Sequence, residues 1–453
     1  MVLYFFSLGK HQMYLFPLNY ARMLLFAVTM ECLQFSIKEC KMSTIRPFQA
    51  VRPSDGELAS RIAALPYDVY TSSEARHIVR ENPLSFLRID RAETQFPEGT
   101  DMYSPEVYEK AHDLLEQMIS EGGFCREEDP CYYIYALTMN GRTQTGLVGC
   151  ASVDDYTGGV ILKHENTLEA KELDRFRHID ICSAQTGPIF LAYRPDSAVR
   201  AILHKVQKQK PLYDFTSEDH IRHSVWRIDD PGDIGNITHL FSLIPHLYIA
   251  DGHHRAASAV KAGLKRRAED TGFTGDEEYN FFLSVLFPAD ELQIYDYNRV
   301  VSDLNGYTFD KILDIVENTF EIRDNGSEPY RPAKKGEFGM YHNGQWFRLK
   351  ARPEVCSDDP VKGLDVSILQ DRILAPVLGI HDPKTDSRIS FIGGIRGLGE
   401  LEKQADSSGG IAFSMYPTSM DELMRVADSG MLMPPKSTWF EPKLRSGLFI
   451  HQF

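Results

Sequence analysis

The feature that most constrains the fold is a short apolar run that passes directly into an alanine-rich segment. Residues 247–250 (Leu-Tyr-Ile-Ala) are typical of a buried strand, and residues 256–261 have high helix propensity. Asp251 and Gly252 leave room only for a tight turn near the start of the helix. The chain is therefore expected to contain a strand that meets a helix N-terminus, which requires both kinds of element in one fold.

Short apolar runs alternate with helical patterns from Ile45 onward, which predicts an α+β fold with mixed sheets and helices. The dipeptides Asn140-Gly141 and Asn343-Gly344 tolerate positive φ, so each predicts a hairpin. The predicted helices are residues 57–65, 73–80, 105–120, 310–319, 366–378 and 419–427, and residues 448–451 are predicted as a terminal strand.

Three regions are expected along the chain. Residues 1–42 are apolar without a lasting period, and Pro17 and Asn19 interrupt them, so we predict a non-conforming N-terminal extension, with a weak signal sequence as the alternative. Residues 324–336 are rich in Gly, Pro and charge and mark a boundary. Residues 43–325 are then an N-terminal and central catalytic region, and residues 326–453 a C-terminal region that contributes an anion-binding loop.

The charge balance limits the partners. The chain has 49 Lys plus Arg against 64 Asp plus Glu, a net charge of −15. Such a surface repels nucleic acid and anionic membranes, so neither is expected as a partner, and an anion must be held by a local basic cluster. The seven cysteines are scattered without a C-x-x-C pair, which favours reduced thiols in a cytoplasmic protein. The oligomeric state stays open, with a homodimer as one option.

The predicted strand-to-helix junction gathers groups that suit a phosphate. The free N–H groups of a helix N-terminus attract an anion, and Gly252 lets the backbone approach it. His253 and His254 can donate hydrogen bonds, Arg255 can bind a phosphate with two bonds, and Asp251 can coordinate Mg²⁺ or accept a proton. The plainer interpretation is that Asp251 only caps the helix. Zinc is disfavoured because no H-x-x-x-H pattern accompanies the two histidines.

A second candidate cluster follows a strand predicted at residues 158–162. Glu165 comes just after that strand and next to His164, so it is a candidate general base toward an alcohol. The helix expected after it has a charged face, since four residues lie at three- and four-residue steps, and a solvated surface is the alternative interpretation. These residues are Lys171, Asp174, Arg175 and His178.

A third cluster is the proline-rich segment 433–447. Lys436, Lys443 and Arg445 are opposed there only by Glu441, which predicts an anion-attracting surface, and a loop without a role is the alternative.

Two segments carry weaker signals. Tyr67 and Asp68 follow Pro66 and could present a binding edge, although core packing and capping explain them about as well. Residues 393–397 are glycine-rich but lack the lysine of a phosphate-binding P-loop, so a Walker-type ATPase is not expected.

Together these segments resemble a family long known as a bacterial and archaeal domain of unknown function, some members of which are free-serine kinases. The resemblance runs from about Ile45 to Phe453, and the D-G-H-H-R stretch is also similar to that of ParB-like and sulfiredoxin-like free-serine kinases. The residues that carry it are Arg46-Pro47-Phe48, Pro66-Tyr67-Asp68-Val69, His164-Glu165 with Thr167, Asp174-Arg175, Asp251-Gly252-His253-His254-Arg255, Met433-Pro434-Pro435-Lys436-Ser437-Thr438 and Pro442-Lys443.

The resemblance implies a ParB/sulfiredoxin-like core elaborated by N- and C-terminal regions. It implies phosphoryl transfer, with Mg²⁺, from pyrophosphate, ADP or ATP to the hydroxyl of free L-serine, which gives O-phosphoserine for cysteine biosynthesis. Glu165 would be the base, Asp251 a metal ligand or second base, and His253 a further catalytic residue. The implied phosphate-binding residues are Gly252, His254, Arg255, Arg175, Lys436, Thr438 and Lys443, and the implied substrate-binding residues are His164, Tyr67 and Asp68.

One departure from the family pattern is Asn298, since a histidine is expected before Arg299. Two other functions share the same residues and stay open. One is a ParB-like nucleotide-binding switch without turnover, and the other is a metal-dependent phosphohydrolase. The donor and the acceptor among small hydroxy amino acids also stay open.

Overall fold

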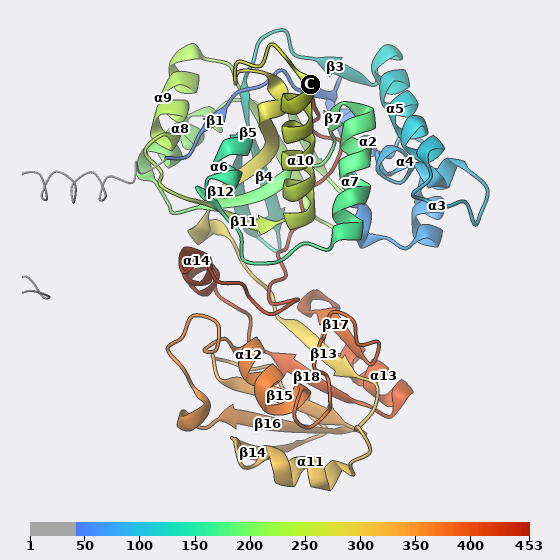
Figure 1. Ribbon diagram of the computed structural model, residues 1–453, viewed down its shortest axis with the longest axis vertical. Coiled ribbons are helices and arrows are strands. Elements are labelled where there is room, and N and C mark those ends of the chain that lie inside the picture. Colours follow the sequence, from blue (N-terminus) through green and yellow to red (C-terminus); the bar gives the residue numbers. More distant parts are fainter. Residues whose placement is uncertain (1–41) are drawn as a thin grey trace, which may run out of the picture. The chain divides into compact units, whose positions relative to one another are not determined.

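The computed structural model describes residues 42–453, of which residues 43–453 form one compact unit. The N-terminal extension predicted for residues 1–42 lies outside the described residues, apart from Met42. Two large sheets and their helices make a mixed α+β fold, which confirms the predicted fold class (Figure 1). The ParB/sulfiredoxin-like core stays a prediction. Within residues 42–453, no helix is both long enough and apolar enough to cross a bilayer.

The larger sheet contains the predicted strand-to-helix junction. Its strands are β1 (Ile45–Arg46), β4 (Tyr132–Met139), β5 (Arg142–Ser152), β6 (Ile161–Leu162), β8 (Ile189–Tyr193), β9 (Tyr213–Thr216), β10 (Arg222–Ile228), β11 (Leu247–Asp251) and β12 (Phe281–Pro288). Their order is β6-β11-β8-β12-β5-β4-β10-β9, and β1 also pairs with β5. The predicted hairpin between β4 and β5 is confirmed, and Asn140 and Gly141 have φ of 51° and 78°. β11 ends beside β6, with which it runs parallel.

Helices cover this sheet. They include α6 (Val153–Thr157), α7 (Glu169–Cys182), α8 (Ser197–Val206), α9 (Pro231–Phe241) and α10 (His253–Glu269). Figure 1 shows α7 and α10 side by side, and the two helices pack against each other. The buried face of α10 consists of small residues such as Ala256 and Ala259, which share a core with Leu191 and Phe282 of the sheet. Small side chains allow α10 to lie close to the sheet, which fixes the position of its N-terminus.

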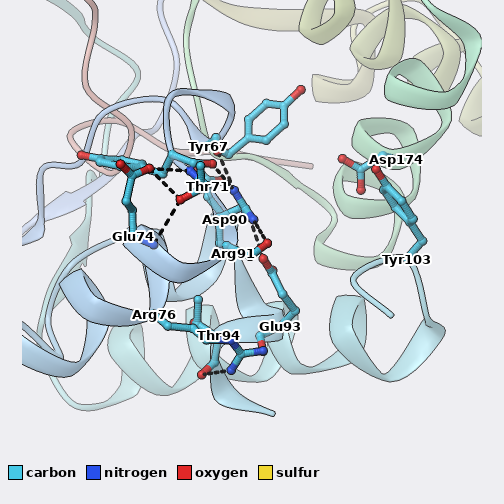
Figure 2. Close-up of polar contacts among 12 residues, drawn as sticks. Tyr67, Thr71, Glu74, Arg76, Asp90, Arg91, Glu93, Thr94, Tyr103 and Asp174 are labelled. Carbon is cyan, nitrogen blue, oxygen red and sulfur yellow. Dashed lines mark hydrogen bonds and ion pairs between the residues drawn. The ribbon is translucent and has the colours of Figure 1, made fainter. Parts of the chain in front are cut away.

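A helical region lies near the start of the described chain. It contains α2 (Gly56–Ile62), the 3₁₀ turn η1 (Tyr67–Val69), α3 (Ser72–Glu81), α4 (Leu87–Asp90), α5 (Pro105–Ser120) and the strand pair β2 (Val51–Pro53) with β3 (Phe124–Arg126). The helices predicted at residues 57–65, 73–80 and 105–120 are confirmed. A capping box formed by Thr71 and Glu74 starts α3, and its bonds are drawn in Figure 2.

The second sheet has six strands. They are β13 (Tyr297–Val301), β14 (Phe320–Gly326), β15 (Glu337–His342), β16 (Gln345–Ala351), β17 (Ile389–Gly393) and β18 (Ile411–Met415), in the order β14-β16-β15-β18-β13-β17. The hairpin predicted at Asn343-Gly344 is confirmed. The boundary expected between residues 325 and 326 falls inside this sheet, because β13 and β14 pair with strands that come later in the chain.

Four helices accompany the second sheet. They are α11 (Phe309–Val316), α12 (Asp365–Leu369), α13 (Leu398–Ser408) and α14 (Met420–Asp428). The helices predicted at residues 310–319 and 419–427 are confirmed within a few residues. The one predicted at residues 366–378 begins as α12 and continues as a π-helical turn over Gln370–Leu374.

The C-terminal segment returns from the six-stranded sheet to the region of the nine-stranded sheet. Ser446 and Ile450 form isolated bridges with Ala64 and Val51, and β19 (His451–Gln452) pairs with β7 (Ala184–Gln185). Figure 1 shows this red segment ending beside β7. The strand predicted at residues 448–451 is thus wrong in its bounds, since β19 begins only at His451. The pairing of β19 holds the end of the C-terminal segment in place.

The close packing of α10 can be tested at Gly263. A Cβ atom there would lie well inside contact distance of the Tyr279 carbonyl oxygen, which is backbone and cannot turn away. We expect Gly263→Ala to lower the free energy of unfolding by about 1–3 kcal/mol, measured by urea denaturation. Gly235→Ala in α9 is the matched control, because nothing lies within 4 Å of the added atom. It should be neutral or stabilising by up to about 1 kcal/mol, and an equal loss in both variants would contradict this packing.

Candidate functional site: a strand-to-helix junction closed by the C-terminal segment

Gly252 forms the turn between β11 and α10. Its φ is 91°, in the left-handed region that favours glycine, and it is the N-cap residue of α10. No side chain caps the helix, so the interpretation of Asp251 as a simple cap is wrong. A Cβ atom at Gly252 would come within 3.1 Å of the Arg255 guanidinium. The first turn of α10 therefore keeps uncapped N–H groups beside a cation, as an anion requires.

Asp251 pairs with two cations at this junction. Its Oδ1 lies 3.2 Å from Lys443 Nζ and its Oδ2 lies 3.1 Å from Arg255 Nη2. One third of the Asp251 side chain is exposed, so the cluster faces an accessible surface. Burial raises the pKa of the Asp251 carboxyl, but Lys443 and Arg255 outweigh this effect and lower it to about 2. Burial opposes the charge of Lys443, yet Asp251 and Glu441 give its ammonium a raised pKa, so both partners are charged at neutral pH.

Two buried histidines lie next to this cluster. His164 follows β6, and its ring meets that of His253 edge to face with centroids 4.5 Å apart. Burial lowers the pKa of His164 to about 4, and burial together with His164 lowers the pKa of His253 well below its usual range. Both rings are therefore neutral at pH 7. His253 Nε2 is buried without a hydrogen-bond partner among residues 42–453.

His164 also holds the C-terminal segment. Its carbonyl oxygen accepts a hydrogen bond of 2.8 Å from Met433 N, and its Nε2 lies 3.4 Å from Thr438 Oγ1. Thr438 thereby lies beside His164 at the junction, and its role as an anion contact stays a prediction. Three contacts, at Met433, Thr438 and Lys443, connect residues far apart in sequence.

His254 takes part in chain structure. Leu168 N donates a 2.9 Å hydrogen bond to His254 Nε2, so this nitrogen is an acceptor and is not free to donate to a phosphate. Burial and the nearby Lys171 lower the pKa of the ring, which agrees with a neutral imidazole. The contact fixes the loop that follows Glu165.

Glu165 lies in that loop, half-buried, and its carboxylate accepts no hydrogen bond from the described chain. Burial raises its pKa, while Lys436 and Lys384 act in the opposite direction and Asp251 adds to the rise. These interactions place Glu165 near Asp251 and the proline-rich segment. A carboxylate with a raised pKa and no committed partner is suited to accept a proton.

The charged face predicted on α7 is largely buried. Arg175 is 8% exposed, its Nε donates to Asp174 Oδ2 at 2.8 Å, and its guanidinium lies 3.9 Å from the centre of the Tyr67 ring. His178 is buried as well, and only Lys171 of the four is exposed. The solvated-surface interpretation is therefore wrong for Asp174, Arg175 and His178. Burial raises the pKa of Tyr67 to about 12 despite the nearby Arg175, so its hydroxyl keeps its proton.

The Tyr67 turn is held by Arg91, a residue that the sequence did not indicate. Figure 2 shows this network. Arg91 Nη1 donates to the carbonyl oxygens of Tyr67 and Tyr70 at 3.0 and 2.9 Å, and its Nε donates to Glu93 Oε1 at 2.7 Å. Asp68 is exposed on the same turn and acts electrostatically on His254. The binding edge predicted at Tyr67 and Asp68 thus lies beside the junction.

The proline-rich segment supplies two cations to the site and not three. Lys436 is exposed and acts on Glu165, and Lys443 pairs with Asp251. Arg445 is buried elsewhere, where it pairs with Asp219 and donates to Ser217 Oγ at 3.1 Å. The expectation of an anion-attracting surface made by all three cations is corrected accordingly.

Aromatic residues were missed by the sequence analysis because single rings carry no local signal. Lys443 Nζ lies 5.1 Å from the centre of the Trp439 ring, and the Tyr297 ring meets the Trp439 ring at 5.0 Å. These rings restrict the position of Lys443. Asn298, where a histidine was expected, accepts from Met415 N and donates to Asp296 Oδ2, both at 2.8 Å. Here this residue is part of the sheet.

The donor set does not fit a magnesium site built by the protein alone. Among residues 42–453, no group of three or more His, Cys, Asp and Glu is placed to hold a metal ion. Asp251, the predicted ligand, uses its two oxygens on two cations. Magnesium therefore stays a prediction. The cysteines of the described chain are free thiols, as expected, and they are Cys125, Cys131, Cys150, Cys182 and Cys356.

Fold and site together define a mixed α+β protein in which a strand meets an uncapped helix N-terminus beside two cations. The model of a family described as "Protein of unknown function (DUF1015)" matches residues 45–367, and the chain belongs to this family. This match confirms the resemblance inferred from the sequence. A comparison with curated protein sequences finds no match.

Solved structures show distant similarity. A free serine kinase variant in complex with AMP is 13% identical, with 70% of this chain and 92% of that chain covered and a TM-score of 0.33. A free serine kinase variant in complex with ADP is 12% identical, with 68% and 93% covered and a TM-score of 0.34. A conserved hypothetical protein from Pyrococcus furiosus is 14% identical, with 66% and 93% covered and a TM-score of 0.31.

The pair of Asp251 and Lys443 predicts a pH-dependent stability. We expect Lys443→Met to lower the free energy of unfolding by about 1–3 kcal/mol at pH 7, because a partly buried carboxylate loses a partner. The pKa of Asp251 is lower in the folded state than in the unfolded state, so its contribution is complete above about pH 4 and is lost as the pH falls toward 2. In urea denaturation, the difference in free energy of unfolding between wild type and Lys443→Met should become smaller as the pH is lowered from 7 to 3.

Lys436→Met is the control for this experiment, because Lys436 is exposed and forms no ion pair within the described chain. Its effect on stability should stay within about 0.5 kcal/mol at every pH. A Lys443→Met difference that does not change with pH would contradict the assignment of the pair.

Proposed function

We propose that this protein transfers a phosphoryl group from pyrophosphate, or from ADP or ATP, to the hydroxyl of free L-serine. The observation that carries the proposal is the uncapped N-terminus of α10, flanked by Lys443 and Arg255, with the uncommitted carboxylate of Glu165 nearby. In this proposal the enzyme works in the cytoplasm and its product, O-phosphoserine, supplies cysteine biosynthesis.

The donor phosphate is proposed to bind at the first turn of α10. Phosphoryl transfer depends on positioning and on neutralising charge over the phosphate oxygens, more than on covalent chemistry by the protein. The backbone N–H groups, Arg255 and Lys443 supply donors on one side, and Lys436 adds positive charge from the proline-rich segment. Arg255 and Lys443 are held by Asp251 before the donor arrives, so little reorganisation of these two cations opposes binding.

Glu165 is proposed as the general base. The serine oxygen attacks the terminal phosphorus of the donor, its proton passes to Glu165, and the bond from that phosphorus to the bridging oxygen breaks. With pyrophosphate as donor, inorganic phosphate leaves. A raised pKa makes Glu165 the stronger base of the two carboxylates, because Asp251 at about 2 binds a proton poorly at neutral pH.

Asp251 is proposed to orient Arg255 and Lys443 for the donor. His164 and His253 are neutral and buried, so they are expected to shape the site and to donate at most a hydrogen bond. The Nε2 of His253 has no hydrogen-bond partner among residues 42–453, so a phosphate oxygen would be a suitable partner for it. The assays include Mg²⁺, which the family resemblance implies.

The base can be tested by substitution. Purified protein is incubated with Mg²⁺, serine and one donor at a time, namely pyrophosphate, ADP or ATP. Phosphorus NMR should detect O-phosphoserine with at least one of these donors. Glu165→Gln should lower kcat by about 10²–10⁴-fold, because the acceptor proton loses its base. Glu169→Gln is the matched control, since Glu169 is exposed at the start of α7. Its kcat should equal that of wild type.

Other outcomes of the same assay separate the alternatives. Release of phosphate without phosphoserine would indicate a phosphohydrolase. Nucleotide binding without turnover of any donor would indicate a switch. Either result, or full activity in Glu165→Gln, would contradict the proposal.

The proposal also predicts how the rate depends on pH. If Glu165 is the base, kcat falls as the pH drops through its pKa. Lys436 lowers the pKa of Glu165, so removing this cation in Lys436→Met should raise that pKa and move the acid limb of the profile to higher pH. The measurement is kcat between pH 4 and pH 8 for both proteins. An unchanged limb, or a shift to lower pH, would contradict the role of Glu165.

A further inference from the structure

A small cavity lies beside the junction. Its volume is about 30 Å³, and Arg255 forms one part of its wall while Tyr67 and Arg175 form another. This volume holds about two water-sized groups. Other polar residues of the wall are Asp90, Gln185, Thr186 and Ser446. Because Arg255 belongs to both, the cavity continues the proposed phosphate site.

Asp90 is the most unusual residue of this wall. It is 5% exposed, at the end of α4, and Figure 2 shows it near Tyr67 and Arg91. Its Oδ1 accepts a 2.9 Å hydrogen bond from Thr186 Oγ1, and its Oδ2 accepts none from residues 42–453. This buried carboxylate has one neutral hydrogen bond and interacts electrostatically with Arg175, but no ion pair within the described chain replaces its lost hydration. A cationic group in the cavity would provide that replacement.

Arg175 presents the opposite charge to the same cavity. Its Nε donates to Asp174, and its Nη1 is 3.4 Å from the Asp90 carbonyl oxygen. Its Nη2 makes no hydrogen bond to the described chain. The guanidinium carbon lies over the Tyr67 ring and Nε is bonded to Asp174, so these two contacts restrict the direction of the remaining donor. The cavity thus offers one carboxylate and one guanidinium on neighbouring walls.

Gly187 keeps the cavity open toward Arg255. A Cβ atom there would lie 3.1 Å from Ser446 Oγ and 3.6 Å from Arg255 Nη1. The absence of a side chain at Gly187 therefore leaves a space between Ser446 and Arg255.

We propose that this cavity binds the charged end of the acceptor amino acid. The ammonium group of the amino acid pairs with Asp90, and its carboxylate pairs with Arg175. Every α-amino acid carries these two charged groups on one carbon, and the cavity wall offers one partner of opposite charge for each. The hydroxyl-bearing carbon then extends past Arg255 toward the donor. The transfer itself rests on the proposed function, but binding of the amino acid does not.

Titration calorimetry with three ligands tests this assignment. L-Serine has both charged groups, ethanolamine lacks the carboxylate, and 3-hydroxypropanoate lacks the ammonium. Wild-type protein should bind serine at least about tenfold more tightly than either analogue, since each leaves one charged wall residue unpaired. Asp90→Asn should weaken the binding of serine by at least about tenfold. It should leave the affinity for 3-hydroxypropanoate unchanged, because that ligand has no ammonium group to pair with Asp90.

Asp113→Asn, on the exposed face of α5, is the matched control and should bind all three ligands as wild type does. Gly187→Ala is a second variant in case Asp90→Asn does not fold. Its added methyl group narrows the cavity and should weaken the binding of serine. Circular dichroism and thermal unfolding confirm that each variant is folded.

The outcomes separate this inference from the proposed function. No serine binding to wild type, or folded Asp90→Asn and Gly187→Ala that bind serine as wild type does, would overturn the cavity assignment even if phosphoserine forms. If serine binds with the predicted dependence on Asp90 but no donor yields phosphoserine, the cavity assignment is supported and the proposed function fails.

Discussion

The ion pairs of Asp251 with Lys443 and Arg255 are the interaction on which the site depends. They join the end of β11, the first turn of α10 and the C-terminal segment, three pieces that are separated in sequence by up to 192 residues. Removing Lys443 would leave the partly buried Asp251 carboxylate with Arg255 alone, so this ion pair favours the position of the C-terminal segment. The contacts of His164 with Met433 and Thr438 hold the same segment from the other side.

This arrangement gathers positive charge locally in an acidic protein. The net charge is −15, yet the junction combines the N-terminus of α10 with Arg255, Lys443 and Lys436 against Asp251 and Glu165. The two buried histidines are neutral, so they add shape and hydrogen-bonding capacity without adding charge. The local charge of this surface is therefore set by the residues at the junction and differs from the overall charge of the chain.

Elements with strong local signals could be predicted from the sequence. The two Asn-Gly hairpins, the helix at Pro105–Ser120 and the junction at Asp251 follow from turn chemistry and periodicity, and the structure confirms them. Long-range partners could not be predicted in this way. Arg445 has the same local context as Lys443 but pairs with Asp219, and the buried pair of Asp174 and Arg175 has the spacing of a solvated face.

The cavity beside the junction shows the same limit. Asp90 gives no signal in the sequence, since its importance comes from burial and from the lack of a second hydrogen-bond partner in the described chain. The boundary expected between residues 325 and 326 lies inside the six-stranded sheet for a related reason. The strand β13 pairs with the later strands β17 and β18, and the local composition of residues 324–336 does not indicate this pairing. What joins distant segments is tertiary packing, which periodicity does not record.

A crystal structure of the full chain with bound pyrophosphate would show whether the anion binds at the first turn of α10. We expect a phosphate group within about 2.7–3.2 Å of the first N–H groups of α10 and within reach of Arg255 and Lys443. Pyrophosphate bound elsewhere, with the corner at Gly252 filled by packed side chains, would contradict it.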